Sequence, residues 1–184
     1  MFRDGPVTAG LAVEHNGVVP GEMVELSGEV VNDSSRDIEG INIIMYETVI
    51  FKRKHINKSR RILEIKRGGM EPYSRHSLAG THLTIPSLPP TMVTNLVNIN
   101  YWLKLEVELP GFDLEPQILL VVGTEPARNL VDQFGPLCAS VPQHWGKARL
   151  EKKERKKLYK GDKEFVPRYK MYQHKKENGE LQLY

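Results

Sequence analysis

The chain has 184 residues, of which 40% are hydrophobic and 27% charged. It contains no run of about 18 apolar residues, so its composition excludes a disordered or membrane-spanning protein. The net charge of +3 is divided, because residues 1–146 carry 13 Lys and Arg against 17 Asp and Glu, and residues 147–184 carry 13 against 6. This mildly acidic body with a basic tail argues against nucleic acid as a partner.

The first part of the chain predicts short strands separated by turns. Asn16-Gly17 and Pro20-Gly21 are strong turn dipeptides, and apolar and polar residues alternate over 24–31. After the turn-forming segment NDSSRD, a longer alternation covers residues 41–51. Glu47 interrupts the apolar row of that strand, and we expect it at a bend or at the sheet edge.

The middle of the chain continues this pattern. Residues 52–69 are basic, with a short strand expected at 61–66, and residues 74–85 hold another strand candidate. The clearest pattern is LVNINYWLKLEVELPGF, in which apolar side chains occupy every second position over residues 97–109. A turn and a short buried strand, QILLVVGT, follow.

Strands divided by turns, without helical periodicity, predict one antiparallel β-sandwich over residues 10–125. Residues 1–9 precede it as a leader. Residues 126–184 form a basic tail that we expect to be irregular or partly helical, and partly disordered.

Five segments in the same order and spacing resemble the C-terminal domain of arrestin-domain-containing proteins, the α-arrestins. They are GVVPGEMVELSGEVVNDSSRDI, the long alternating strand after it, LTIPSLPPT, LVNINYWLKLEVELPGF and ILLVVGT. The resemblance covers roughly residues 10–125. It implies an all-β, immunoglobulin-like sandwich. It also implies a non-enzymatic adaptor that binds cytoplasmic parts of membrane receptors or transporters and directs their sorting, endocytosis or ubiquitination.

Family members usually carry two sandwiches, and this chain begins at the second. They often carry Pro-Pro-x-Tyr motifs that recruit WW-domain ubiquitin ligases, and the nearest match here is Val166-Pro167-Arg168-Tyr169. WW grooves bind polyproline II ligands, so Val166, Pro167 and Tyr169 are candidates for a weak ligase contact. The alternative is an extended tail that touches nothing.

Two basic regions and one aromatic residue are candidates for partner contacts. The tail could bind an anionic membrane surface, or be simply solvated. Trp102, on the polar face of its strand, is a possible surface anchor. A cluster without acids could contact an anion or an acidic peptide, or be an exposed hairpin end, and it comprises Lys52, Arg53, Lys54, Lys58, Arg60 and Arg61.

Nothing in the sequence indicates catalysis. The six histidines lack the spacing of a metal site, and no Gly-rich phosphate loop occurs. The one cysteine, Cys138, has no basic neighbour to activate its thiol and cannot form an internal disulfide. We therefore expect no enzymatic activity, metal or cofactor.

The absence of a disulfide framework fits a reducing compartment, and we expect a cytoplasmic protein, peripheral at the plasma membrane or endosomes. Two alternatives to the adaptor stay open. One is a single-domain fragment that pairs with a full-length relative, and the other is a basic-tailed module that binds anionic lipid.

Overall fold

The computed structural model describes residues 5–126, 144–147 and 168–172. Within these residues the regular elements are strands, apart from one 3-10 turn, η1 (Lys52–Lys54), and no helix is long and apolar enough to cross a membrane. The chain divides into two compact units. Unit 1 comprises Met1–Gly17, Val24–Leu83 and Thr91–Val121, and unit 2 comprises Val18–Met23, Thr84–Pro90 and Val122–Tyr184.

The largest sheet is built around two long strands, β6 (Gly40–Phe51) and β11 (Val97–Leu109), which pair antiparallel. The strand order is β3-β13-β11-β6-β7, and β10 and β12 also pair with β11. The remaining strands of this sheet are β3 (Gly17–Val18), β7 (Ile56–Lys66), β10 (Met92–Val93), β12 (Phe112–Leu114) and β13 (Gln117–Val122).

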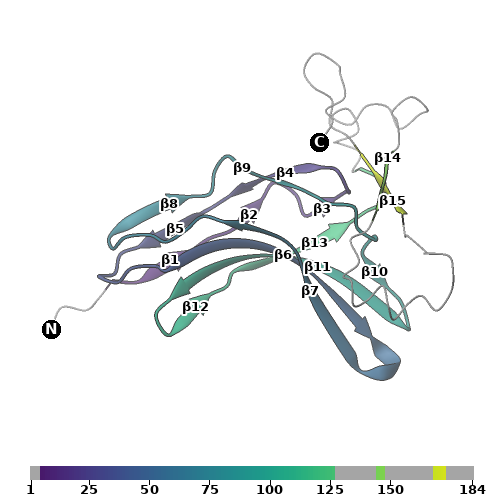
Figure 1. Ribbon diagram of the computed structural model, residues 1–184, viewed down its shortest axis with the longest axis horizontal. Helices are drawn as coiled ribbons and strands as arrows, with labels where there is room; N and C mark the ends of the chain where they lie inside the picture. Colours follow the sequence, from purple (N-terminus) through teal and green to yellow (C-terminus); the bar gives the residue numbers. More distant parts are fainter. Residues whose placement is uncertain (1–4, 127–143, 148–167, 173–184) are drawn as a thin grey trace, which may run out of the picture. The chain divides into compact units, whose positions relative to one another are not determined.

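Two three-stranded sheets, in the orders β1-β5-β8 and β2-β4-β9, form the opposite layer. Figure 1 shows these six strands on one side of β6 and β11. Gly28 separates β4 from β5 at φ 131°, where a Cβ would lie 2.2 Å from the Gly10 carbonyl oxygen, so only glycine fits. The strands are β1 (Val7–Ala9), β2 (Ala12–Val13), β4 (Met23–Ser27), β5 (Glu29–Asn32), β8 (Ser74–Ser77) and β9 (Thr81–Thr84).

The core of unit 1 lies between these layers, as the alternation of apolar residues predicts. Every second side chain of β11 from Tyr101 to Leu109 is buried. Val24 and Leu26 of β4 and Val30 of β5 are buried as well. The predicted antiparallel β-sandwich is therefore confirmed, and the long strand expected at 97–109 has those bounds.

Two strands of the sandwich differ from the sequence-based expectation. β7 begins at Ile56 rather than near residue 61, because its ladder with β6 continues from Asn42 opposite Lys66 to Phe51 opposite Ile56. The single strand candidate at 74–85 is divided into β8 and β9, which pair with different neighbours.

Strands also occur outside the predicted boundaries of the sandwich. β1 lies within the expected leader and pairs with β5, with Val7 opposite Asn32. In the expected tail, β14 (His144–Lys147) pairs antiparallel with β15 (Arg168–Met171), so these residues are extended rather than helical. Most of the tail, including Cys138, lies outside the described residues.

The stability of unit 1 depends on the buried row of β11. Leu105→Ala, at a fully buried position, should lower the free energy of unfolding by about 2–5 kcal/mol because it leaves a cavity in the core. Val93→Ala, at a position that is 72% exposed, should change it by less than about 0.5 kcal/mol. Urea unfolding of the full chain measures both, and equal losses would contradict this description of the core.

Candidate functional site

The structure divides the predicted basic cluster into an exposed turn and paired side chains. Lys52, Arg53 and Lys54 form η1 at the turn between β6 and β7, and all three are exposed. His55 closes the turn in the left-handed conformation, with φ 49°. Lys58 is also exposed, and residues 51–59 contain no acid. We call residues 52–58 the hairpin tip.

Arg60 has a different role, because it forms a charged contact with Glu47. Its Nε and Nη2 atoms donate to the two carboxylate oxygens of Glu47 at 2.8 and 3.1 Å. The Tyr101 hydroxyl donates to the same carboxylate at 3.0 Å. The Glu47 side chain is only 6% exposed and that of Arg60 is 27% exposed. Arg60 of β7 is therefore held against Glu47 of β6 by a bidentate ion pair.

This contact explains why an acid interrupts the apolar row of β6. The expectation that Glu47 marks the sheet edge is wrong, because β6 lies between β11 and β7. A register shift does occur beside it, between Met45 and Tyr46. A buried carboxylate is tolerated here because three donor groups satisfy it.

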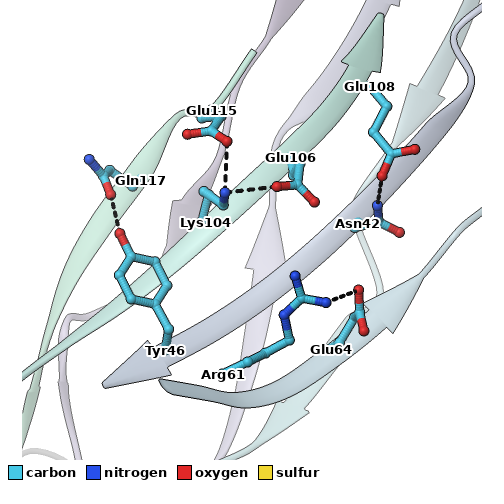
Figure 2. Close-up of polar contacts among 9 residues, drawn as sticks. All are labelled: Asn42, Tyr46, Arg61, Glu64, Lys104, Glu106, Glu108, Glu115 and Gln117. Carbon is cyan, nitrogen blue, oxygen red and sulfur yellow. Dashed lines mark hydrogen bonds and ion pairs between the residues drawn. The ribbon is translucent and has the colours of Figure 1, made fainter. Parts of the chain in front are cut away.

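Arg61 lies on the outer face of the large sheet, within a set of polar contacts (Figure 2). Its guanidinium donates to Glu64 at 2.8 Å. Lys104 donates to both Glu106 and Glu115 at 2.8 Å. A hollow of about 220 Å³ on this face is lined by Ile44, Tyr46, Ser59, Arg60, Arg61 and Lys104.

The hollow is balanced in charge. Each of the three cations that line it has at least one carboxylate within 2.8 Å. A hollow whose cations are already paired attracts an anionic ligand weakly. Arg60 and Arg61 thus differ from Lys52–Lys54, which form no ion pair with a carboxylate of the described residues.

The same contacts shift the pKa values of Lys104 and Glu106. Burial opposes the charge of Lys104, but the hydrogen bonds to Glu106 and Glu115 and their negative charges outweigh it and raise the Lys104 pKa. The hydrogen bond from Lys104 lowers the pKa of Glu106, against burial, which raises it. The pair is therefore charged at neutral pH, and its two members stabilise one another.

Trp102 is half-buried on the outer face of β11. It stands opposite Tyr46 of β6 on one side and Leu119 of β13 on the other. Leu119 is 40% exposed and Val121, next on the same face, is 43% exposed. Trp102 is thus flanked by the sheet rather than fully open, and its role as a surface anchor stays a prediction.

The candidate WW ligand lies only partly within the described residues. Val166 and Pro167 are outside them, and Tyr169 belongs to β15, opposite Gly146 of β14. Strand pairing uses the backbone groups that a polyproline II ligand leaves free. A WW domain would therefore have to open the β14–β15 pair before it could bind Tyr169.

Sequence reasoning missed Tyr172, which joins the chain after β15 to the other segments of unit 2. Its amide donates to the Pro20 carbonyl at 2.8 Å, and its hydroxyl donates to the Thr124 carbonyl at 2.6 Å. Its ring packs against buried Val19. Gly21, at φ 91°, permits this approach, since a Cβ there would lie 1.9 Å from the Tyr172 oxygen. No short-range pattern announces these contacts, because Pro20 and Thr124 precede Tyr172 by 152 and 48 positions.

The sequence matches the family model for "Arrestin (or S-antigen), C-terminal domain" over residues 3–127. The chain belongs to the arrestin-domain family. The match covers all the strands from β1 to β13, and it extends the resemblance seen in residues 10–125 to β1.

Curated relatives of this arrestin domain come from mammals and a nematode. Arrestin domain-containing protein 4 of Mus musculus is 25% identical over 129 residues, covering 68% of this chain and 31% of that protein. Arrestin domain-containing protein 1 of Rattus norvegicus is 24% identical over 113 residues, covering 60% and 26%. Arrestin domain-containing protein 17 of Caenorhabditis elegans is 31% identical over 111 residues, covering 56% and 26%. The chain therefore spans less than a third of the length of these relatives.

A bacterial structure shares the fold. The sporulation control protein Spo0M from Bacillus subtilis matches with a TM-score of 0.51 and 21% identity, over 66% of this chain and 51% of that one. At this identity the likeness concerns the sandwich alone.

Within residues 5–126, 144–147 and 168–172, no three His, Cys, Asp or Glu side chains are placed to hold a metal ion.

The Glu47–Arg60 contact can be tested by a double-mutant cycle. Arg60→Leu should lower the free energy of unfolding by about 2–4 kcal/mol, because it leaves the buried Glu47 carboxylate without its counter-charge. Glu47→Leu combined with Arg60→Leu should recover at least half of that loss, since no charge remains buried. Urea unfolding at pH 7 measures the cycle. Additive losses would show that the pair is not coupled.

The Lys104–Glu106 pair predicts a pH-dependent contribution to stability. Because the pKa of Glu106 is lowered in the folded state, its contribution is present above the ordinary value of 4.5 and is lost as pH falls through the folded value. Lys104→Met should cost about 0.5–1 kcal/mol at pH 7, and the difference from wild type should shrink below pH 4.5. Urea unfolding at several pH values tests this. Lys66→Met, at an exposed position, should give a difference that does not change with pH.

Proposed function

We propose that this chain is a non-enzymatic arrestin-like adaptor, which binds cytoplasmic parts of membrane receptors or transporters and directs their trafficking, endocytosis or ubiquitination. The observation that carries the proposal is the match to the arrestin C-terminal domain over residues 3–127. Proteins of this family generally act as adaptors without catalytic activity. An adaptor of this kind works in the cytoplasm, at the plasma membrane or at endosomes.

The hairpin tip is the part of the domain best suited to contact an acidic segment of such a cargo. Lys52, Arg53 and Lys54 are exposed, and within the described residues no carboxylate forms an ion pair with them. The cations beside the outer hollow, by contrast, are already paired. An acidic peptide therefore gains more from the tip, where no existing ion pair has to be broken.

Ubiquitination would require a ligase, and WW-domain ligases are the candidates. Tyr169 is the aromatic residue that such a domain would grip. Its place in the β14–β15 pair makes binding dependent on release of β15, which lowers the apparent affinity by the fraction of chains in which β15 is open.

A second candidate function is pairing with a full-length relative. It is favoured by a half-buried apolar surface on the face of the large sheet that carries Glu47, at the end next to the hairpin tip, where Val49, Phe51, Val97 and Ile99 lie. A second arrestin chain could cover these side chains. Such pairing would appear as a 1:1 complex on size-exclusion chromatography with light scattering, in the absence of any cargo.

Cargo binding can be tested with immobilised peptides from the cytoplasmic parts of membrane receptors and transporters. Each acidic peptide is paired with a version in which Asp and Glu are replaced by Asn and Gln. We expect the full chain to bind the acidic versions, and Lys52→Glu with Lys54→Glu to weaken binding by roughly 30-fold or more, since two favourable charges become repulsive.

The matched control replaces two exposed bases elsewhere in unit 1, Lys66→Glu with Arg75→Glu. These changes alter the net charge equally and should change binding by less than about 3-fold. If both double variants bind equally well, the hairpin tip is not the contact. If no acidic peptide binds at all, the adaptor proposal loses its support.

A further inference from the structure

Exposed apolar side chains gather beside the hairpin tip, although they come from a distant part of the sequence. Val93 is 72% exposed, Leu96 52% and Met92 39%, and Ile56 of the hairpin is 41% exposed. The Lys52 amide donates to the Leu96 carbonyl at 2.9 Å, which joins the two turns. Figure 1 shows β10 and the β6–β7 turn at the same end of the large sheet.

The ladder explains why these residues meet. Val97, the first residue of β11, stands opposite Phe51, the last of β6, so the turn before β11 lies beside the turn after β6. Met92 then returns along β11, opposite Ile99. Two neighbouring turns therefore present aliphatic and basic side chains together. We call residues 52–58 with 92–96 the tip surface.

The tip surface differs in charge from the outer face of the same sheet. On the outer face, Arg61 and Lys104 each have a carboxylate partner within 2.8 Å. On the tip surface the sequence holds Lys52, Arg53, Lys54 and Lys58, and neither residues 52–58 nor 92–96 contain an acid. No carboxylate of the described residues forms an ion pair with these bases, so their positive charge extends outward over about a Debye length, near 10 Å at 0.1 M salt.

We propose that the tip surface binds an anionic lipid bilayer, with the bases on the headgroups and the aliphatic side chains in the interfacial region. Basic residues are attracted to a leaflet that contains anionic lipid, and aliphatic side chains gain by leaving water. Neither the electrostatic attraction nor the burial of aliphatic side chains requires a shaped groove. The aliphatic residues here lie on turns rather than in a hollow. A bilayer accepts such an arrangement, whereas an acidic peptide would contact the bases and leave Val93 and Leu96 in water.

This inference adds a second partner to the proposed function and uses some of the same bases. A cargo emerges from the membrane, so lipid contact would bring the adaptor to the surface where the cargo lies, and an acidic peptide would then compete with the headgroups for Lys52 and Lys54. The vesicle experiment below contains no cargo, so its failure would leave the cargo proposal standing, and failure of cargo binding would leave lipid binding standing.

The test is flotation of the full chain with vesicles of phosphatidylcholine alone or with about 30% phosphatidylserine. We expect binding to the anionic vesicles and little to the neutral ones. Lys52→Glu with Lys54→Glu should weaken binding to anionic vesicles by roughly 30-fold or more. Raising the salt to 0.5 M should weaken wild-type binding in the same direction, because screening shortens the range of the field.

The apolar part needs its own variant and control. Val93→Ser with Leu96→Ser should weaken binding by roughly 10-fold while leaving all charges in place. The control is Tyr73→Ser with Phe112→Ser, because these side chains are 72% and 55% exposed and lie outside the tip surface. The control should bind as wild type does. Urea unfolding of each variant shows that the domain remains folded.

Several results would overturn the proposal. Equal binding of the Lys52/Lys54 variant and wild type would mean that another basic region, such as the tail, binds the vesicles. Equal binding to neutral and anionic vesicles would show that attraction between the bases and anionic lipid does not contribute. Unchanged binding of the Val93/Leu96 variant, or equal weakening by its control, would exclude insertion at the tip. Binding of acidic peptides without any binding to vesicles would leave the tip as a protein contact alone.

Discussion

The pairing of β6 with β11 is the interaction on which the rest of this arrestin domain depends. Twelve residue pairs join the strands, from Val97 opposite Phe51 to Glu108 opposite Gly40. Side chains alternate between the faces of a sheet, so a slip of one residue would move the whole buried row to solvent. The same register places Tyr101 opposite Glu47, where the hydroxyl reaches the buried carboxylate. Core packing and a polar contact therefore select the same alignment.

That alignment also separates two electrostatic environments. Along the outer face, Lys104 contacts Glu115 in the link between β12 and β13, and Asn42 of β6 contacts Glu108 of β11, so these charges and dipoles are satisfied by neighbours. At the end of the hairpin, residues 51–59 contain no acid, and no carboxylate of the described residues forms an ion pair with Lys52, Arg53 or Lys54. The same sheet thus carries paired charges on its face and unpaired charges at its tip. Counting bases in the sequence does not distinguish the two.

Much of the fold could be predicted from the sequence because a strand with one buried face has a visible period of two. β11 and β6 show that period, and their bounds agree with the predicted ones to within one residue. Only the second half of β7 could be predicted, since residues 56–60 are polar or basic at most positions and show no apolar row. Its first half is a strand because β6 extends far enough to pair with it.

The site was less predictable, since its contacts depend on register. Glu47 and Arg60 are thirteen positions apart, and only the hairpin brings them together. The sequence does contain an indication of this contact. An acid within an apolar row needs a partner, and Arg60 is a base on the next strand of the hairpin. The contact between Leu96 and Lys52 has no such indication in the sequence. It results from the pairing of β6 with β11, which no local pattern announces.

Burial along the two long strands shows where the core ends. On β6 the side chains are buried through Met45 and half-buried from Thr48 onward, and on β11 they are half-buried from Val97 to Asn100 and then alternately buried. Apolar residues at the inner end are explained by packing between the layers. At the tip, by contrast, Val93 and Leu96 are aliphatic and yet exposed. These exposed aliphatic side chains do not contribute to the core, and they lie beside the bases of the hairpin tip. Such a surface is best explained by contact with a membrane or with another molecule.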